Sequence, residues 1–421
     1  MKTTVCVVGG GPAGLVLGLL LARQGVAVTV LEKHADFLRD FRGDTVHPST
    51  LNMLDEIGLG ERMAALRGRK AGALRATFDD GTYAIVDFTR LPAPHNYLYF
   101  VPQWDFLEML ATEAARLPTF TLLRSATVTG LLRDASGAVA GVRAVGPEGE
   151  LEIQASLTVA CDGRDSAVRR ELGLKPVEYG APMDVLWFRI SRHADDGDGL
   201  AMRIGAGGLM LAVDRGDYYQ CAYVIAKGGY DKIHAAGLEA LREQVTRRHP
   251  TLADRVGELA TWDDVKLLTV KVNRLKRWHA PGALLIGDAA HAMSPIGGVG
   301  INLAVQDAAA TARMLGPKLA TGQPVTEADL TAVQKRRRLP AVVTQNIQRA
   351  AQRRVVDPLL HTTGRIEAPA PIRLLQRIPA LQALPARLVG IGVRPEHLRW
   401  PPPWPDEAVI RYDGHGFRLC R

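Results

Sequence analysis

The sequence predicts an α/β protein that combines a parallel sheet, a second sheet of antiparallel strands and a helical C-terminal segment. Three observations lead to this prediction. Residues 5–33 have the pattern strand, glycine turn, helix, strand; residues 182–226 hold short strands between Gly and Asp turns; and apolar residues after residue 368 recur at helical spacing. With 421 residues, 47% of them hydrophobic, the chain can form two or three domains around a large core.

The first strand and the turn after it form a motif. Residues 5–8, Val-Cys-Val-Val, carry no charge, which is typical of a strand buried on both faces of a parallel sheet. The G-x-G-x-x-G spacing follows, in which Gly9 would make the tight turn, Gly11 would let the backbone approach a pyrophosphate, and Gly14 would let the next helix pack closely on the strand. We therefore expect a phosphate-binding turn here.

A helix and a second strand complete this unit. The helix over residues 15–24 would point its N-terminal N–H groups at the bound anion. The strand over residues 26–31 ends at Glu32, where an acid accepts both hydroxyls of an adenosine ribose and disfavours a 2′-phosphate. The unit predicts a Rossmann-like, dinucleotide-binding domain, and its residues alone leave FAD and NAD both open.

A loop over residues 36–50 exceeds a minimal connection, which indicates a functional segment. Arg42 in this loop would place a guanidinium against a phosphate, and His47 precedes a helix that starts near Ser49. Farther along, Asp80-Gly81 predicts a hairpin within residues 74–88. The elements expected next are a helix over 103–117 and a meander of strands over 122–132, 139–145 and 151–159.

Residues 182–226 predict a second sheet that is antiparallel. In the strand DVLWFRIS, Trp187 and Arg189 share one face, whereas Phe188 and Ile190 share the other. An arginine beside a tryptophan indicates the wall of a mixed pocket, and the opposite face has the composition of a core. The expected division is a dinucleotide-binding domain of 1–73, 102–181 and 263–360, a substrate domain of 74–101 and 182–262, and a C-terminal helical, proline-rich tail of 361–421.

The C-terminal third is expected to be mainly helical, with helices over 301–315 and 327–356. Residues 335–354 carry seven basic side chains and no acid, a pattern typical of a solvated helix face. In the tail, an apolar stripe from Leu374 to Leu388 is interrupted by Pro379 and Pro385. We expect short helices held on the protein surface, with an amphipathic membrane contact as the alternative.

Composition excludes several classes of protein. The uncharged run 3–22 resembles a signal or membrane segment, but the Gly-Pro cluster within it leaves a helix of about ten apolar residues, too short to span a bilayer. The four cysteines are far apart and form no C-x-x-C, so neither a disulfide scaffold nor a metal site is indicated, and a cytoplasmic location fits. Hydrolase, zinc-protease, P-loop and nucleic-acid-binding motifs are absent from the sequence.

Three separated segments would converge on one extended ligand. The first is the glycine turn with Glu32, and the second is Asp162-Gly163, directly after a strand. The third begins at Gly287-Asp288 and continues through Pro295 to a glycine-rich helix start. In this order and separation they resemble the class A FAD-dependent monooxygenases of the para-hydroxybenzoate hydroxylase type, and the resemblance covers about residues 1–360.

The resemblance implies FAD as the bound cofactor and NADH or NADPH as a transient co-substrate. It implies that Asp288 binds the ribityl chain or pyrophosphate, that Asp162 serves both FAD and the reduced nicotinamide, and that Gln103 touches FAD. The segment after Pro295 would abut the flavin ring. Backbone N–H groups at the start of the late helix could stabilise the anion of reduced flavin, and they belong to Gly300, Ile301 and Asn302.

The function implied is an NAD(P)H-dependent monooxygenase that uses O2 and a flavin C4a-hydroperoxide to hydroxylate an aromatic, polyketide or quinone-like small molecule. The alternatives are an FAD-dependent oxidase or dehydrogenase of the same fold, and a membrane-associated, ubiquinone-type hydroxylase. A halogenase is disfavoured because its W-x-W-x-I-P motif is lacking. The candidates beyond the cofactor set are His47, Arg189 and Pro295 for catalysis and Trp187, Met210 and Tyr223 for substrate contact. Substrate identity and oligomeric state stay open.

Overall fold

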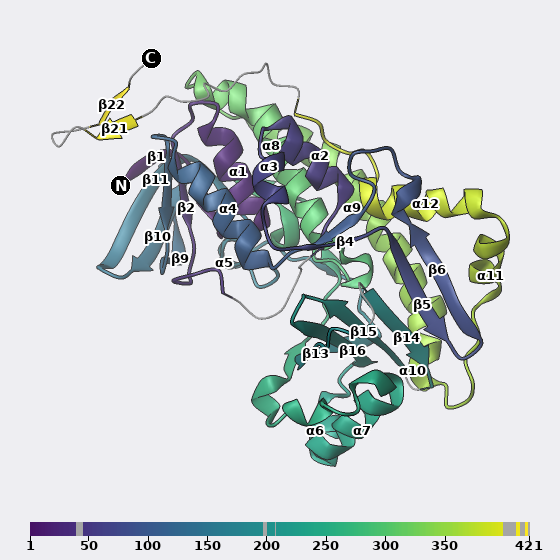
Figure 1. The fold of residues 1–421 in the computed structure, drawn as a ribbon. Coiled ribbons are helices and arrows are strands. Elements are labelled where there is room, and N and C mark those ends of the chain that lie inside the picture. The colour runs from purple at the N-terminus through teal and green to yellow at the C-terminus, as the bar shows by residue number, and fades with distance from the viewer. Residues whose placement is uncertain (39–44, 197–199, 207, 399–409, 413–416, 420–421) are drawn as a thin grey trace.

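The structure is a computed structural model that describes residues 1–38, 45–196, 200–206, 208–398, 410–412 and 417–419. It is built on two large sheets, each with its own helices (Figure 1). In the described part of the chain, no helix has both the length and the apolar character required to cross a bilayer.

The first sheet is parallel at its centre, as predicted. Its parallel strands lie in the order β20, β11, β1, β2, β8. The edge strand β19 and the meander strands β9 and β10 are antiparallel. The bounds are β1 (Lys2–Val8), β2 (Val28–Leu31), β8 (Phe120–Leu123), β9 (Thr127–Arg133), β10 (Val139–Gly146), β11 (Gly149–Ala160), β19 (His279–Ala280) and β20 (Ala283–Leu285).

Helix α1 (Pro12–Ala22) explains the long uncharged run near the N-terminus. Every residue from Ala13 to Ala22 is buried, because the helix packs against the sheet, α4 (Gln103–Ala115) and α8 (Gly300–Ala320). A helix that is apolar on all sides is one enclosed by protein. The turn in front of α1 is therefore fixed by the core behind it.

The second sheet is mostly antiparallel and recruits the predicted hairpin around Asp80-Gly81. The strand order is β17, β13, β16, β15, β14, β5, β6, and β14 pairs with β5 in parallel. The bounds are β5 (Ala73–Phe78), β6 (Gly81–Asp87), β13 (Met183–Ser191), β14 (Leu200–Gly205), β15 (Gly208–Asp214), β16 (Tyr218–Ala226) and β17 (Lys266–Leu268). A third, small sheet consists of β3 (Thr45–Val46), β7 (Leu98–Phe100) and β4 (Arg69–Ala71), in that order.

The two faces of the second sheet have different neighbours. One face packs on α6 (Tyr230–Ala236) and α7 (Leu238–Arg248) around Phe188, and Figure 1 shows this pair of helices at one end of the molecule. The other face carries Val185, Trp187 and Leu211 and meets Ile296 and α10 (Asp357–His361). The segment after β16 forms two helices because Gly237, with a φ of +92°, separates α6 from α7.

The C-terminal part continues α9 (Glu327–Ala351) through a π-helical turn, η7 (Gln352–Val356), into α10. The chain then follows the edge strand β6 with α11 (Ala370–Arg377), η8 (Pro379–Gln382) and α12 (Ala383–Ala386), and the π-helical η9 (Arg387–Ile391) comes next. The Trp- and Pro-rich residues 400–405 of the tail lie outside the described residues. Shorter elements are α2 (Pro48–Glu56), α3 (Gly60–Ala64), α5 (Ala167–Glu171), β12 (Val177–Glu178), β18 (Asn273–Arg274), β21 (Ile410–Tyr412), β22 (Phe417–Leu419) and 3-10 turns at Phe88–Arg90, Pro250–Leu252, Val256–Glu258, Trp262–Asp264, Gly287–Ala289 and Ile296–Gly298.

Candidate active site

The three glycines of the turn are needed for different reasons. A Cβ on Gly14 would lie 1.8 Å from the Gly9 carbonyl oxygen, and a Cβ on Gly9, whose φ is +104°, would lie 2.5 Å from the Cys161 oxygen. The protein itself therefore requires these two glycines. A Cβ on Gly11 would meet no protein atom within 4 Å. The space in front of Gly11 is open, which fits the expected approach of a phosphate to this backbone.

Glu32 lies beside this turn at the end of β2. Its side chain is buried, and its Oε2 accepts a hydrogen bond of 2.9 Å from the Gly10 N–H. Its Oε1 accepts a second bond, of 3.0 Å, from the His34 N–H. Two backbone donors thus fix the carboxylate next to the glycine turn, and its contact with ribose hydroxyls stays a prediction.

Asp162 directly follows β11, which is the neighbour of β1. Its Oδ2 accepts a 3.2 Å bond from the Val168 N–H, whereas its Oδ1 is buried with no hydrogen-bond partner among the described residues. Burial raises the pKa of this carboxyl above its usual value. A buried acceptor without a donor is costly in a finished core, so this oxygen fits a contact with a ligand hydroxyl or N–H.

Asp288 lies in the turn after β20, and its side chain is 40% exposed. Loss of surrounding water raises the pKa of its carboxyl, and the Arg164 guanidinium, 3.9 Å away, opposes that shift. The two acidic turns are physically connected, because Arg169 from the segment after Asp162 donates a 2.9 Å bond to the Ala289 carbonyl. The second and third predicted segments therefore meet as expected.

His291 has a structural role behind the Asp288 turn. Its Nε2 lies 2.6 Å from Oδ2 of Asp307, which also accepts a 3.1 Å bond from the Gly287 N–H. Arg337 donates a 2.9 Å bond to the other oxygen of Asp307. Burial alone would raise the pKa of Asp307, but His291 and Arg337 hold it below its usual value. This network was not predicted, although an acid inside the apolar run 303–310 was a visible signal.

The start of α8 presents backbone donors. Gly297 and Gly298 have φ values of +78° and +63°, which suit only glycine, and the N-cap residue Val299 provides no side-chain cap. The Oδ1 of Asn302 accepts bonds from the hydroxyls of Ser49, at 2.8 Å, and Thr50, at 2.6 Å. The Asn302 side chain therefore ties α8 to α2, and the donors available to a ligand are the backbone N–H groups of Gly300, Ile301 and Asn302.

The expectation that His47 polarises a substrate is not supported by its surroundings. The ring is fully buried, with Nδ1 2.9 Å from the Val389 oxygen and Nε2 3.0 Å from the Gly298 oxygen. Burial lowers the pKa of His47 to about 4, so the ring is neutral at ordinary pH. Each nitrogen lies beside a backbone carbonyl, and the neutral ring donates to one of the two, so His47 lies between the loop before α8 and the C-terminal segment.

The predicted substrate residues divide between the two faces of the second sheet. Trp187 lies on the face that meets Ile296, next to Pro295, and its Nε1 is buried with no partner among the described residues. Met210 and Tyr223 lie on the opposite face, among the side chains that pack on α7, and the Tyr223 hydroxyl donates a 2.8 Å bond to Gln244. The expectation that these two share a pocket wall with Trp187 is therefore wrong, because the strand register turns them away from it.

The structure gives fewer contacts for three further predicted residues, Arg189, Gln103 and Arg42. Arg189 is exposed, and its guanidinium stacks 3.8 Å from the ring centre of Tyr218. Gln103 is the first residue of α4 and is half-buried. Arg42 lies outside the described residues. Contact of Arg189 with a substrate and of Gln103 with FAD stay predictions.

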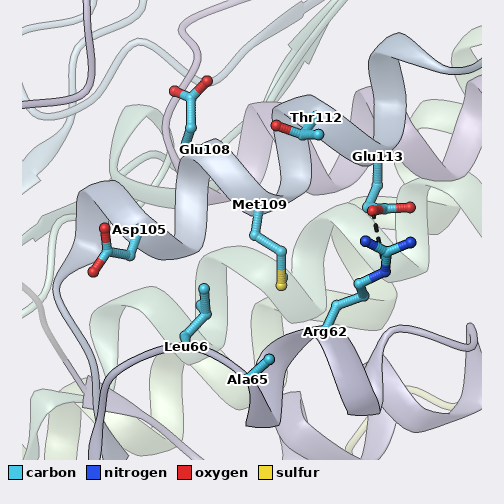
Figure 2. Close-up of a pocket in the computed structure, with 8 residues that line it drawn as sticks. All are labelled: Arg62, Ala65, Leu66, Asp105, Glu108, Met109, Thr112 and Glu113. Atoms are coloured by element: carbon cyan, nitrogen blue, oxygen red, sulfur yellow. Dashed lines mark ion pairs between the residues drawn. The ribbon is translucent and has the colours of Figure 1, made fainter.

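A surface groove of about 380 Å³ lies elsewhere, between α3 and α4. Figure 2 shows the carboxylates of Asp105, Glu108 and Glu113 around it, with Arg62 facing Glu113 at 3.5 Å. None of the residues that line it belongs to the three motif segments. Three carboxylates repel the phosphates of a dinucleotide, so this groove is not the cofactor site.

The open space at Gly11, the unpartnered oxygen of Asp162 and the uncapped start of α8 all fit FAD. Residues 2–347 match the FAD binding domain family. The chain belongs to this family. It is a class A FAD-dependent monooxygenase of the para-hydroxybenzoate hydroxylase type, with FAD as cofactor and NADH or NADPH as co-substrate, which confirms the expected class, cofactor and fold.

Several proteins similar to this monooxygenase are themselves named monooxygenases. It is 33% identical over 392 residues to 6-methylpretetramide 4-monooxygenase of Streptomyces rimosus, covering 92% of each chain. It is 30% identical over 378 residues to 12-dehydrotetracycline 5-monooxygenase/anhydrotetracycline 6-monooxygenase of the same species, covering 85% of this chain and 71% of the other. The solved anhydrotetracycline hydroxylase OxyS of Streptomyces rimosus superposes with a TM-score of 0.73 at 27% identity, covering 97% of this chain and 79% of that one.

Proposed function

We propose that this monooxygenase hydroxylates a polycyclic aromatic substrate of the polyketide type. The observation that carries the proposal is the 33% identity, over 92% of both chains, to an enzyme named 6-methylpretetramide 4-monooxygenase. The overall reaction would consume NAD(P)H, O2 and a proton, insert one oxygen atom into a C–H bond of the substrate and release the other as water. Bound FAD supplies the redox chemistry, taking a hydride from the nicotinamide and activating O2.

The side chains on the inner face of the second sheet support a flat, apolar substrate. Trp187, Leu209, Leu211 and Ala222 lie on this face and pack in one cluster with Ile296. Ile296 follows Pro295 in the segment that leads to α8. An aromatic polycycle held between this wall and the loop would be shielded from water, which limits loss of the activated oxygen.

Trp187 is the hydrogen-bond donor that we assign to this wall. Its Nε1–H is buried and has no acceptor among the described residues, and an indole N–H in a wall usually finds a partner. A carbonyl or phenol oxygen of the substrate would supply that acceptor and set which ring edge faces the flavin. Arg189, two residues farther along the same strand face, would interact with a polar group at the exposed rim.

The first motif would hold the adenosine end of FAD and the other two its central part. Glu32 would accept the ribose hydroxyls beside the Gly11 turn, and Asp162 and Asp288 would accept hydrogen bonds farther along the molecule. The backbone N–H groups at the start of α8 would face the part of the ring that becomes negative on reduction. None of these roles is proton transfer to the substrate, and the contributions that we assign to the protein are orientation and exclusion of water.

The test is a coupled assay on purified holoenzyme. NADH and NADPH consumption, peroxide release and product mass would be measured with a pretetramide-type polycyclic phenol and, separately, with resorcinol. We expect the polycycle to give a product one oxygen atom heavier with little peroxide. Recovery of all consumed reducing equivalents as peroxide with every substrate would favour an oxidase and contradict the proposal, and efficient hydroxylation of resorcinol alone would contradict the polycyclic substrate class.

A further inference from the structure

An exposed apolar surface lies on the C-terminal segment, beyond the family match that ends at residue 347. Four large apolar side chains there face solvent, and we call them the apolar ridge: Leu374 is 49% exposed, Ile378 45%, Leu381 42% and Leu384 71%. The described residues contain nine exposed large hydrophobic side chains, and four of them fall within these eleven consecutive positions. Scattered exposed leucines need no explanation, but a cluster of this kind indicates a contact surface.

The ridge is presented by well-anchored elements. On the inner side, the Gln376 Nε2 donates a 2.7 Å bond to the Ala84 carbonyl in β6, and Ala386 is fully buried. Gln382 is also buried and donates a 3.0 Å bond to the Leu375 carbonyl. Gln376 and Gln382 thus bond to the protein, whereas the four side chains of the apolar ridge face solvent. Figure 1 shows α11 and α12 along an outer edge of the molecule.

The segment that carries the ridge contains charges of one sign only. Residues 368–395 contain four arginines and no acid. Arg373 is engaged by Glu367 at 2.7 Å and lies 3.7 Å from Asp80, so those two nearby carboxylates are already paired. Arg377 and Arg387 are exposed and have no acidic partner among the described residues. The surface therefore combines apolar area with unneutralised positive charge.

We propose that the apolar ridge, with Arg377 and Arg387, docks this enzyme on the surface of an anionic lipid membrane. Short helices with outward leucines and flanking arginines have the composition of segments that lie in the headgroup region of a bilayer. A second copy of the chain is a poorer occupant, because a two-fold contact centred on the ridge would bring like-charged arginines together. The proposal does not depend on the substrate assigned above.

The primary experiment is co-sedimentation of the FAD-loaded enzyme with vesicles. Two compositions are compared, phosphatidylcholine alone and phosphatidylcholine containing phosphatidylglycerol, each at low and at physiological ionic strength. We expect the enzyme to pellet with the anionic vesicles and to pellet less as salt rises, because screening weakens the arginine contribution. An enzyme that stays in the supernatant with both compositions overturns the proposal and leaves an acidic protein as the occupant to consider.

Three variants separate the contributions. Leu374→Ser/Leu381→Ser/Leu384→Ser should lower the partition coefficient about tenfold or more, because less apolar surface enters the bilayer. Arg377→Gln/Arg387→Gln should reduce the preference for anionic vesicles about fivefold per arginine at low salt. The matched control, Leu339→Ser/Ile347→Ser, removes side chains that are 50% and 42% exposed on α9 and should pellet like the wild type.

Retention of the flavin spectrum and of the thermal unfolding midpoint shows that each variant is folded. Pelleting of the triple leucine variant to the same extent as the wild type would overturn the proposal. The proposal would also be overturned if light scattering showed a wild-type dimer that is lost in the triple leucine variant, while neither protein pellets with vesicles. The ridge would then be a contact between copies of the chain.

Discussion

At the scale of single residues, Gly11 separates cofactor binding from folding. Its φ of −78° and ψ of −173° are available to any amino acid, and a Cβ there meets no protein atom within 4 Å. We expect Gly11→Val to lose bound FAD, as measured by the flavin absorbance of the purified protein, and to unfold at nearly the same thermal midpoint as FAD-free wild type. In contrast, Gly14→Ala should lower stability by about 1–3 kcal/mol or more, because its Cβ overlaps the Gly9 oxygen.

Trp187 provides a second prediction at this scale. Trp187→Phe keeps an aromatic ring in the wall but removes the N–H together with part of the indole, so the substrate would lose some ring contact and one hydrogen bond of about 0.5–1.5 kcal/mol. We expect KM for the polycyclic substrate to rise about two- to tenfold and peroxide release to increase, with the flavin spectrum unchanged. Trp262→Phe is the control, because Trp262 packs on the α6–α7 side of the sheet. Equal effects of the two substitutions would contradict the role of Trp187.

The predicted cofactor residues that the structure places at the ends of parallel strands follow local rules. Glu32, Asp162 and Asp288 each come at the end of a parallel strand, and the ends of neighbouring parallel strands meet at one edge of a sheet. Met210 and Tyr223 were misplaced because the alternation of side chains divides the residues of one strand between its two faces but does not relate the faces of different strands. Only the register between paired strands tells which residues share the face of Trp187. The carbonyl partners of His47 lie 251 and 342 residues away in sequence, so no local pattern could reveal them.

At the scale of elements, His47 joins the loop before α8 to η9 and makes this junction sensitive to pH. The pKa of His47 is about 4 in the folded protein against an ordinary value of 6.5. The unfolded chain binds this proton more tightly than the folded protein does. The stability that depends on a neutral ring is therefore fully present above pH 6.5 and is lost as pH falls toward 4, which lowers the free energy of unfolding by at most about 3 kcal/mol.

The check is urea denaturation of the wild type and His47→Phe between pH 7 and pH 4. The slope of the unfolding free energy against pH should be smaller in the variant. His249, whose pKa burial also lowers to about 4, remains in both proteins and cancels in the comparison. Identical slopes would show that His47 keeps its ordinary pKa in the fold.

At the scale of the whole molecule, Glu396 attaches the C-terminal segment to α8 and α9. Its buried carboxylate accepts from Arg313 at 2.8 Å, Arg336 at 2.5 Å and Arg337 at 3.2 Å. Burial opposes its ionisation, but the three arginines hold the pKa of Glu396 below its usual value. Removing the charge would leave Arg337, which is 1% exposed, with fewer partners inside the protein.

We expect Glu396→Gln to lower the free energy of unfolding by about 3–5 kcal/mol and to make the segment after η9 susceptible to limited proteolysis. Glu367→Gln is the control, since its pair with Arg373 is exposed on both sides and is worth at most about 1 kcal/mol. A similar small loss for both variants would contradict the role of Glu396. The family match ends before this segment, and the sequence indicated only a helical tail, because pairings across 59 to 83 residues depend on the finished fold.

The bridge at His47 and the attachment at Glu396 have a joint consequence. The C-terminal chain that packs against β6, at the edge of the second sheet, contacts His47 through Val389 and contacts arginines of α8 and α9 through Glu396, so it connects that sheet to these helices. The two sheets cannot separate along that side unless these buried contacts break. A bulky polycycle would then have to enter and leave by another opening. Shortening or loosening this C-terminal connection would change the rate of product release before it changed the rate of the chemical step.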